Sequence, residues 1–266
     1  MWLRNLFMKT LRDLRGQVLG WGIGAGLLGW MVIFLYPAFK DQMAGMIELL
    51  EGYPPALMAF FGDMTQLASF AGWLNVELFS YGPPILAVFA VAAGTALVAA
   101  EEERGTLDLL LSQPLRRWRL LTDKFSAFVV ATVLIMTITA LFFVAGSAMI
   151  GETAQLGRIA LATLNIAPVT LASGALALML SVLLRSRRLA TTIALLVVIG
   201  SYFLESLGKV VDVLEPYRPI ALYHYYDSTA ALTRGVKWGD VGILLALTAL
   251  FFAIALLAFQ RRDLAV

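Results

Sequence analysis

The stretch FSAFVVATVLIMTITALFFVAGSAMI, residues 125–150, decides the class of fold, because its 26 consecutive residues carry no charged side chain. An α-helix rises about 1.5 Å per residue, so about 20 apolar residues cross the ~30 Å hydrocarbon core of a bilayer. Surface helices of soluble domains instead alternate apolar and polar positions every turn. This stretch therefore predicts a helix that spans a membrane.

Five further apolar blocks of similar length lie on either side of this one. Of the 266 residues, 60% are hydrophobic and 14% are charged, whereas soluble domains are roughly half apolar and a quarter charged. A water-soluble fold could not cover that much apolar surface. We expect one all-α membrane domain over residues 1–266, with six transmembrane helices at about 18–39, 77–100, 125–150, 158–184, 189–205 and 240–259.

The first 17 residues predict an amphipathic helix that lies on the membrane surface before the first span. Their apolar and basic side chains occupy different faces of a helix: Leu3, Leu6, Phe7, Leu11 and Leu14 against Arg4, Lys9, Arg12 and Arg15. No small-residue cleavage site follows, so we expect the segment to be retained. The segment 40–76, with its Pro54-Pro55 break, predicts a loop with small interfacial helices.

Glycines are concentrated in the first span, at positions 20, 22, 24, 26 and 29. They form two overlapping G-x-x-x-G spacings, which allow another helix backbone to approach closely. Glycine is also simply common in membrane helices. Both interpretations remain open at the level of sequence.

The distribution of Lys and Arg predicts the orientation of the chain. Six spans place the connecting segments alternately on two sides of the membrane, and 14 of the 20 basic residues fall on the side of the termini against 6 on the other. Basic residues are enriched on the cytoplasmic side. We therefore expect both termini in the cytoplasm, and we interpret the short basic clusters as topology signals and not as a nucleic-acid-binding surface.

Several isolated polar residues invite functional interpretations. Asn165 falls inside the fourth span, where it could face a substrate path or make an interhelical hydrogen bond. Glu205 and Glu77 fall near span ends, where we expect their carboxylates to reach water. His224 lies in the aromatic run LYHYYD of an outer segment, typical of a membrane interface.

The segment EEERGTLDLLLSQPLRRWRLLTDK, residues 101–124, joins the second and third spans. Leu107, Leu110 and Leu111 share one helical face, which predicts a short amphipathic helix on the cytoplasmic side. Residues 101–103 suit the first turn of that helix, because the partial charge at a helix N-terminus favours carboxylates. Pro114 discourages further helix, so we expect a short helix that is available to a partner protein.

The pattern E-x-x-x-G-T-L-x-x-L-L-S-x-P in this segment, followed by Arg116, Arg117 and Lys124, resembles that of ABC-2 type permeases. The likeness extends over most of the chain. It includes the basic amphipathic start, a large first outer loop, six spans, and an F-x-R-R-D ending formed by Phe259, Arg261, Arg262 and Asp263.

This resemblance implies an ABC-2 type transmembrane domain that moves substrate when separate nucleotide-binding subunits, which hold ATP and Mg, close on ATP. It implies pairing with a second copy or a similar permease subunit, in contact with membrane lipid. It further implies a prokaryotic plasma membrane and export of a hydrophobic or amphipathic compound, with import left open. The residues expected to couple to the ATPase subunit are Glu101, Glu102, Glu103, Gly105, Thr106, Leu107, Leu110, Leu111, Ser112 and Pro114.

The chain itself contains no phosphate-binding G-x-x-x-x-G-K-[ST] string, since its Gly208-Lys209 pair precedes Val210 and lacks the earlier glycine. We therefore expect that this chain is not itself an enzyme and that it binds no cofactor. An intramembrane metallohydrolase would need several ligands inside the spans, but the sequence has one histidine and no cysteine. An ion-driven carrier would bury ionisable groups near the span centres, and none occurs there. A membrane protein that only recruits or regulates an ATPase remains a further alternative.

Overall fold

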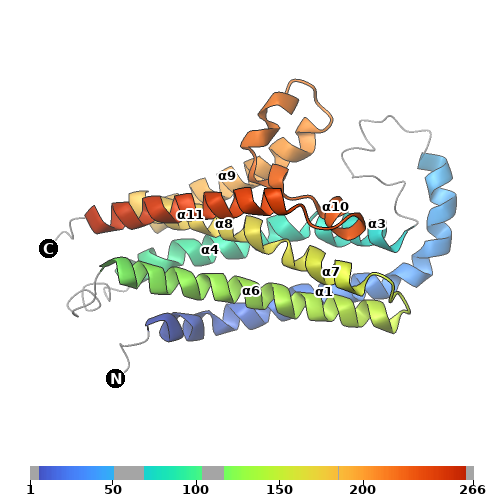
Figure 1. The fold of residues 1–266 in the computed structure, drawn as a ribbon, viewed down its shortest axis with the longest axis horizontal. Coiled ribbons are helices and arrows are strands. Elements are labelled where there is room, and N and C mark those ends of the chain that lie inside the picture. The colour runs from blue at the N-terminus through green and yellow to red at the C-terminus, as the bar shows by residue number, and fades with distance from the viewer. Residues whose placement is uncertain (1–5, 51–68, 104–116, 185, 262–266) are drawn as a thin grey trace.

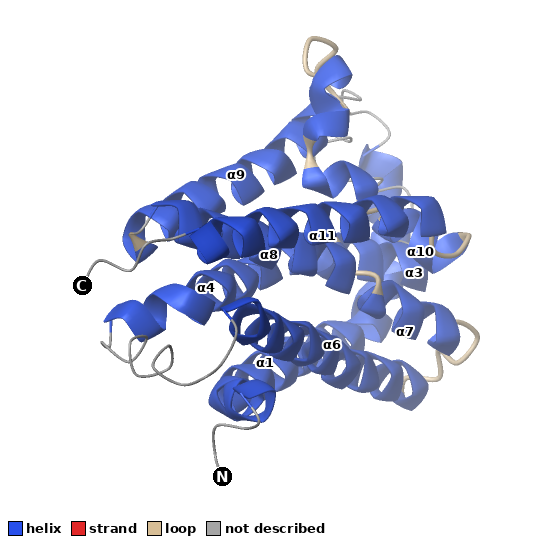
Figure 2. Ribbon diagram, turned by 60° about the vertical axis from the view of Figure 1, so that its left-hand side comes forward, coloured by secondary structure: helices blue, strands red, loops and turns tan. Residues whose placement is uncertain are grey.

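The structure is a computed structural model that describes residues 6–50, 69–103, 117–184 and 186–261 (Figure 1). The described part is a bundle of helices and contains no strand, as Figure 2 shows. In chain order its helices are α1 (Leu6–Leu50), α3 (Phe70–Leu74), the π-helix η3 (Asn75–Phe79), α4 (Gly82–Glu103), α6 (Arg117–Met149), α7 (Leu156–Leu164), α8 (Ala167–Leu184), α9 (Arg187–Gly208), the 3-10 helices η4 (Glu215–Ile220) and η5 (Leu222–Tyr225), α10 (Ser228–Thr233) and α11 (Trp238–Arg261).

Six segments of the described chain are long and apolar enough to cross a membrane, which confirms the predicted fold class. These spans are Leu6–Lys40, Phe70–Ala99, Arg117–Met149, Leu156–Leu184, Arg187–Gly208 and Trp238–Arg261. The second span combines α3, η3 and α4, and the fourth combines α7 and α8. The remaining four spans are single helices.

The fourth span lies at the centre of the bundle. In its most apolar window 83% of the residues are buried, against 28% in the first and fifth spans and 17% in the sixth. Helix α8 contacts α4, α9 and α11, whereas α1 packs mainly on α6 (Figure 2). The outer faces of α1, α9 and α11 are consequently free for lipid or for another subunit.

Two glycine contacts set the spacing of these helices. Gly94 of α4 meets Gly174 of α8, and a Cβ added at Gly94 would overlap the Gly174 carbonyl oxygen. Across the other pair, Gly22 of α1 packs on Ile138 of α6, while the Gly22 carbonyl accepts a 3.4 Å hydrogen bond from the Thr139 hydroxyl. Close backbone approach of this kind is the usual use of glycine between membrane helices.

The structure places the glycines of the first span on two faces of α1, and each interpretation holds for one of them. Gly22, Gly26 and Gly29 face α6 and leave no room for a side chain without rearrangement. Gly20 and Gly24 lie on a different face, where an added Cβ meets nothing within 4 Å. One face of α1 therefore uses glycine for helix packing and another leaves its backbone open.

The helix ends gather at two ends of the bundle (Figure 1). The start of α1, the end of α4, the start of α6 and the end of α11 share one end, which we call the basic end. There the Arg117 guanidinium lies 3.5 Å from the Gln260 carbonyl oxygen. At the opposite end, the cap end, the Trp73 indole N–H donates to the Val32 carbonyl at 3.1 Å and the Tyr226 hydroxyl to the Phe79 carbonyl at 3.4 Å.

Some predicted boundaries differ from the structure. Helix α1 continues without a break from Leu6 through the expected start of the first span and past its expected end to Leu50. The amphipathic start is thus the first turns of a long helix and not a separate element. Pro37 does not interrupt it, because α1 remains helical on both sides of this residue. Helix α6 likewise begins at Arg117, inside the segment expected to connect two spans.

Candidate functional site

Lys124 joins two spans at the basic end. It falls near the end of the second turn of α6, and its side chain is only 3% exposed. The Nζ donates a hydrogen bond of 2.8 Å to the carbonyl oxygen of Leu97 in α4. The contact therefore ties the start of the third span to the last turns of the second.

A buried lysine needs such partners, because moving an ammonium group out of water is costly unless its donors are satisfied. The Leu97 carbonyl is one such partner, six residues before Glu103, where α4 ends. Its hydrogen bond offsets part of the cost of burying the ammonium group.

The acidic triplet occupies a different place from the one predicted. Glu101, Glu102 and Glu103 form the last turn of α4 and not the first turn of a separate helix. No glycine or proline lies between Gly94 and Gly105, so the helix continues through the triplet. The other predicted coupling residues, Gly105 to Ser112 and Pro114, lie outside the described residues. These residues therefore lie, in the chain, between α4 and α6, the two helices that the Lys124 hydrogen bond joins.

The same helix α4 also contacts the fifth span. The hydroxyl of Thr191 in α9 donates to the hydroxyl of Thr95 at 3.2 Å, and Thr95 in turn donates to the Val91 carbonyl at 2.8 Å. Thr95 is fully buried. Helix α4 is therefore hydrogen-bonded to both α6 and α9.

Asn165 marks a break in the fourth span. It is the C-terminal cap of α7, and its backbone N–H donates to the Leu161 carbonyl at 2.8 Å. Helix α8 begins two residues later, at Ala167. The Asn165 side chain is half-buried and forms no hydrogen bond with the part of the chain that the structure describes. Within the described residues the Asn165 side chain thus makes no interhelical hydrogen bond, and its position is that of a helix end. A place for Asn165 on a substrate path stays a prediction.

The structure contains a charged cluster at the cap end that the sequence pattern does not predict. Glu205 was expected to reach water, but it is 6% exposed. Its carboxylate lies 2.8 Å from the Arg218 guanidinium, 3.3 Å from Lys209 Nζ and 3.0 Å from His224 Nδ1. Burial of an acid beside several basic groups is favourable only because they satisfy its oxygens. The i,i+4 pair with Lys209 was the one signal visible in the sequence.

The cluster holds the outer segment against the fifth span. The hydrogen bond to Glu205 raises the pKa of the Arg218 guanidinium above its ordinary value. The Ser201 hydroxyl of α9 accepts the backbone N–H of Leu222 at 2.7 Å, and Tyr223 beside it is buried. His224 thus has a structural partner in Glu205, in place of the simple interfacial position that the sequence predicts.

Asp227 organises the next part of the cap end. Its carboxylate accepts the backbone N–H of Ala230 at 2.8 Å, which caps α10, and it pairs with Lys237 Nζ at 2.7 Å. Although burial pushes the pKa of Asp227 upward, the bonds from Lys237 and Ala230 outweigh it and hold this pKa below its ordinary value. Within the described ranges, no group of three or more His, Asp or Glu side chains is placed to hold a metal ion.

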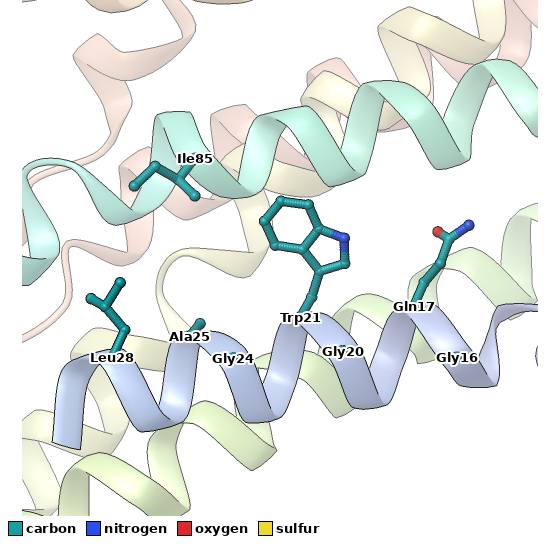
Figure 3. Close-up of a pocket in the computed structure, with 8 residues that line it drawn as sticks. All are labelled: Gly16, Gln17, Gly20, Trp21, Gly24, Ala25, Leu28 and Ile85. Atoms are coloured by element: carbon teal, nitrogen blue, oxygen red, sulfur yellow. The ribbon is translucent and has the colours of Figure 1, made fainter. Parts of the chain in front are cut away.

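A groove of about 490 Å³ lies between α1 and α4 (Figure 3). Three of the seven α1 residues that form its floor are glycines, and Trp21 projects from that floor toward α4. The Trp21 ring lies 6.2 Å from the ring of Phe89 on α4. The lining residues are Gly16, Gln17, Gly20, Trp21, Gly24, Ala25, Leu28 and Ile85.

Comparison with known proteins gives one family. Residues 5–264 match the family model described as ABC-2 family transporter protein. No curated protein sequence matches the chain. The matched range includes all six spans and both ends of the described bundle.

Proposed function

The chain belongs to the ABC-2 family of transporter proteins, and on this premise we propose that it forms the substrate path of a transporter driven by a separate ATPase subunit. Members of the family are transmembrane components of ATP-binding cassette transporters and not the catalytic ATPases. The ATP and its Mg belong to the partner subunit in this proposal.

The observation that carries the proposed coupling is the Lys124 contact. Residues 104–116 connect α4 and α6, and the bond from Lys124 to the Leu97 carbonyl holds those two helices together beside that connection. A force applied to Leu107, Leu110 or Leu111 by an ATPase subunit would then move both helices as one body. Rigid displacement of packed helices is a common way to alternate access to a path.

The buried side chains of the spans support a hydrophobic or amphipathic cargo. Within the described residues, the buried polar groups are Asn75, Lys124, Glu205 and a set of serine and threonine hydroxyls. Lys124 and Glu205 both lie near span ends and have the partners described above. A bundle with so few ionisable groups at its centre favours transport driven by a separate ATPase over transport driven by an ion gradient.

We propose export as the direction of transport.

The exposed helices support assembly with a second permease subunit. Large apolar side chains are exposed on the described faces of α9 and α11, including Leu196, Phe203, Leu250 and Leu257. We propose that a second copy, or a similar chain, covers part of these faces and that lipid covers the rest. The 14 basic residues on the side of the termini support a cytoplasmic location for the basic end, in a prokaryotic plasma membrane.

The coupling proposal is tested with Leu110→Arg. Purified complexes in vesicles are compared for ATPase activity that depends on this chain and for movement of amphipathic fluorescent dyes. We expect both to fall sharply in Leu110→Arg, with the membrane level of the chain unchanged. Val213→Arg adds the same charge at an exposed position of the cap end and serves as the control.

Two outcomes would contradict the proposal in different ways. Unchanged ATPase activity and dye movement in Leu110→Arg would exclude residues 101–114 as the coupling segment. ATPase activity that depends on the chain without movement of any compound would instead favour a protein that recruits or regulates the ATPase.

A further inference from the structure

The groove between α1 and α4 extends along α1 from Gly16 to Leu28. At about 1.5 Å per residue these positions span roughly 18 Å along the helix. One leaflet of a bilayer contributes about half of the ~30 Å hydrocarbon core. The groove thus has the depth of a single leaflet and begins where α1 leaves the basic end.

The floor of the groove is open backbone. An added Cβ at Gly16, Gly20 or Gly24 meets no other atom within 4 Å, whereas the glycines on the opposite face of α1 are in tight contact with α6. The open glycines recur every four residues and therefore line up along one face of the helix. They leave a continuous slot, walled on the other side by Ile85 of α4 (Figure 3).

The walls are apolar except at one position. Trp21, Leu28 and Ile85 supply the apolar surface, and Gln17 supplies an amide near the basic end (Figure 3). The volume of about 490 Å³ falls within the range of roughly 300–1,000 Å³ that is usual for sites of small molecules. A flexible chain of methylene groups fits such a slot better than a compact polar ligand.

Beyond the end of the groove, the same face of α1 carries basic residues. Arg12 lies four residues before Gly16, and Lys9 lies one further turn away. With Arg15 they place three exposed cations in the first three turns of α1, against one exposed acid, Asp13. Basic residues at the membrane surface attract anionic headgroups.

From these observations we propose that the groove binds an acyl chain of an anionic phospholipid, whose phosphate lies against Lys9 and Arg12. The groove covers the depth of one leaflet, which is the depth that the acyl chains of one phospholipid occupy. The charge at its mouth is complementary to a phosphate, and the Gln17 amide is placed to hydrogen-bond the glycerol esters. The site requires only that α1 spans a membrane, so it stands or falls separately from the proposed ATPase coupling.

The test uses the full chain in vesicles of equal parts phosphatidylglycerol and phosphatidylcholine. Each lipid is supplied in turn with a photoreactive group in its acyl chain, and the cross-linked peptides are identified by mass spectrometry. We expect phosphatidylglycerol to label the peptides that contain Trp21 and Ile85 several-fold more than phosphatidylcholine does. Gly20→Leu, which fills the slot, should reduce that labelling several-fold.

Two sets of variants make the result specific. Gly24→Leu is a second filling variant, and Gly200→Leu in α9, which also has open space around it, is the matched control that should label as wild type does. Lys9→Gln combined with Arg12→Gln should remove the preference for phosphatidylglycerol while labelling of the groove by either lipid remains.

Three results would overturn the inference. Labelling that is unaffected by both filling variants would mean that ordinary surrounding lipid is being detected. Equal labelling by the two lipids in the wild type would exclude recognition of the phosphate by the basic residues. Loss of a dimer in Gly20→Leu, with labelling unchanged, would assign the groove to a second copy of the chain.

Discussion

At the scale of single residues, Glu205 contributes more to the structure than its position in the sequence suggests. Its buried carboxylate connects the end of α9 to Lys209, Arg218 and His224. Nothing in the spacing of these residues predicts that the outer segment folds back on α9, because Arg218 and His224 are brought there by tertiary packing. The sequence placed the end of the fifth span at 205, three residues before the end of α9 at Gly208, and predicted the burial of Glu205 wrongly.

Glu205→Gln tests this cluster. The amide keeps a hydrogen-bonding group but removes the charge from the basic groups, so local stability of η5 should fall by about 1–3 kcal/mol. Hydrogen exchange at Leu222–Tyr225 should accelerate accordingly. The exposed acid Glu77 at the same end provides the control Glu77→Gln, and equal exchange in the two variants would contradict a structural role for Glu205.

At the scale of helices, the sequence predicted all the spans because apolar length is a local property. It could not locate ends that depend on tertiary contacts. Helix α6 begins at Arg117 and α4 continues through Glu103, so both extend into the segment read as a connector. The break at Asn165 was also missed, although Pro168 in the first turn of α8 is a local signal for a helix start. The roles of Gly105 to Pro114 stay predictions.

The contact between α4 and α8 depends on Gly94. In Gly94→Ala the new methyl group would overlap the Gly174 carbonyl, so the helices must separate. Overpacking of this kind costs about 1–3 kcal/mol. We expect a lower midpoint in thermal unfolding of the purified protein. Gly242→Ala in α11, where space is open, should unfold as wild type does, and an equal loss in both variants would refute the close contact.

The capping of α10 should depend on pH. The pKa of Asp227 is lower in the folded protein than the value of about 3.9 for an unperturbed aspartate. A carboxyl of this kind stabilises the fold above its unfolded pKa and loses that contribution as the pH falls through the folded pKa. Hydrogen exchange of Ser228–Thr233, corrected for intrinsic rates, should therefore show local destabilisation below about pH 4.

Asp227→Asn separates this titration from other acid effects. The amide still caps α10 but does not titrate, so the pH dependence of exchange in Ser228–Thr233 should largely disappear. An identical pH profile in the wild type and in Asp227→Asn would show that another group controls this helix.

At the scale of the whole molecule, the start of α1 and the end of α11 lie at the same end of the bundle, the basic end (Figure 1). An even number of spans requires this arrangement, and the proposed orientation places it in the cytoplasm. Because the chain has no cysteine, single cysteines report their side of the membrane directly. Thr153→Cys at the cap end should react in intact cells with a maleimide that cannot cross membranes.

Ser186→Cys, between α8 and α9 at the basic end, should react only after the membrane is opened. A cytoplasmic cap end would give the reverse pattern. Reaction of both cysteines in intact cells would contradict the assigned spans, because the two positions are separated by the fourth span.

We propose above that a separate ATPase subunit drives this permease. The most direct measurement is to purify the tagged chain from its native membrane and to identify the proteins that remain bound. We expect an ATPase chain that carries a phosphate-binding loop, bound to the wild type and recovered with reduced ATPase activity in Leu110→Arg. Recovery of the permease without any ATPase chain, or full activity in Leu110→Arg, would contradict it.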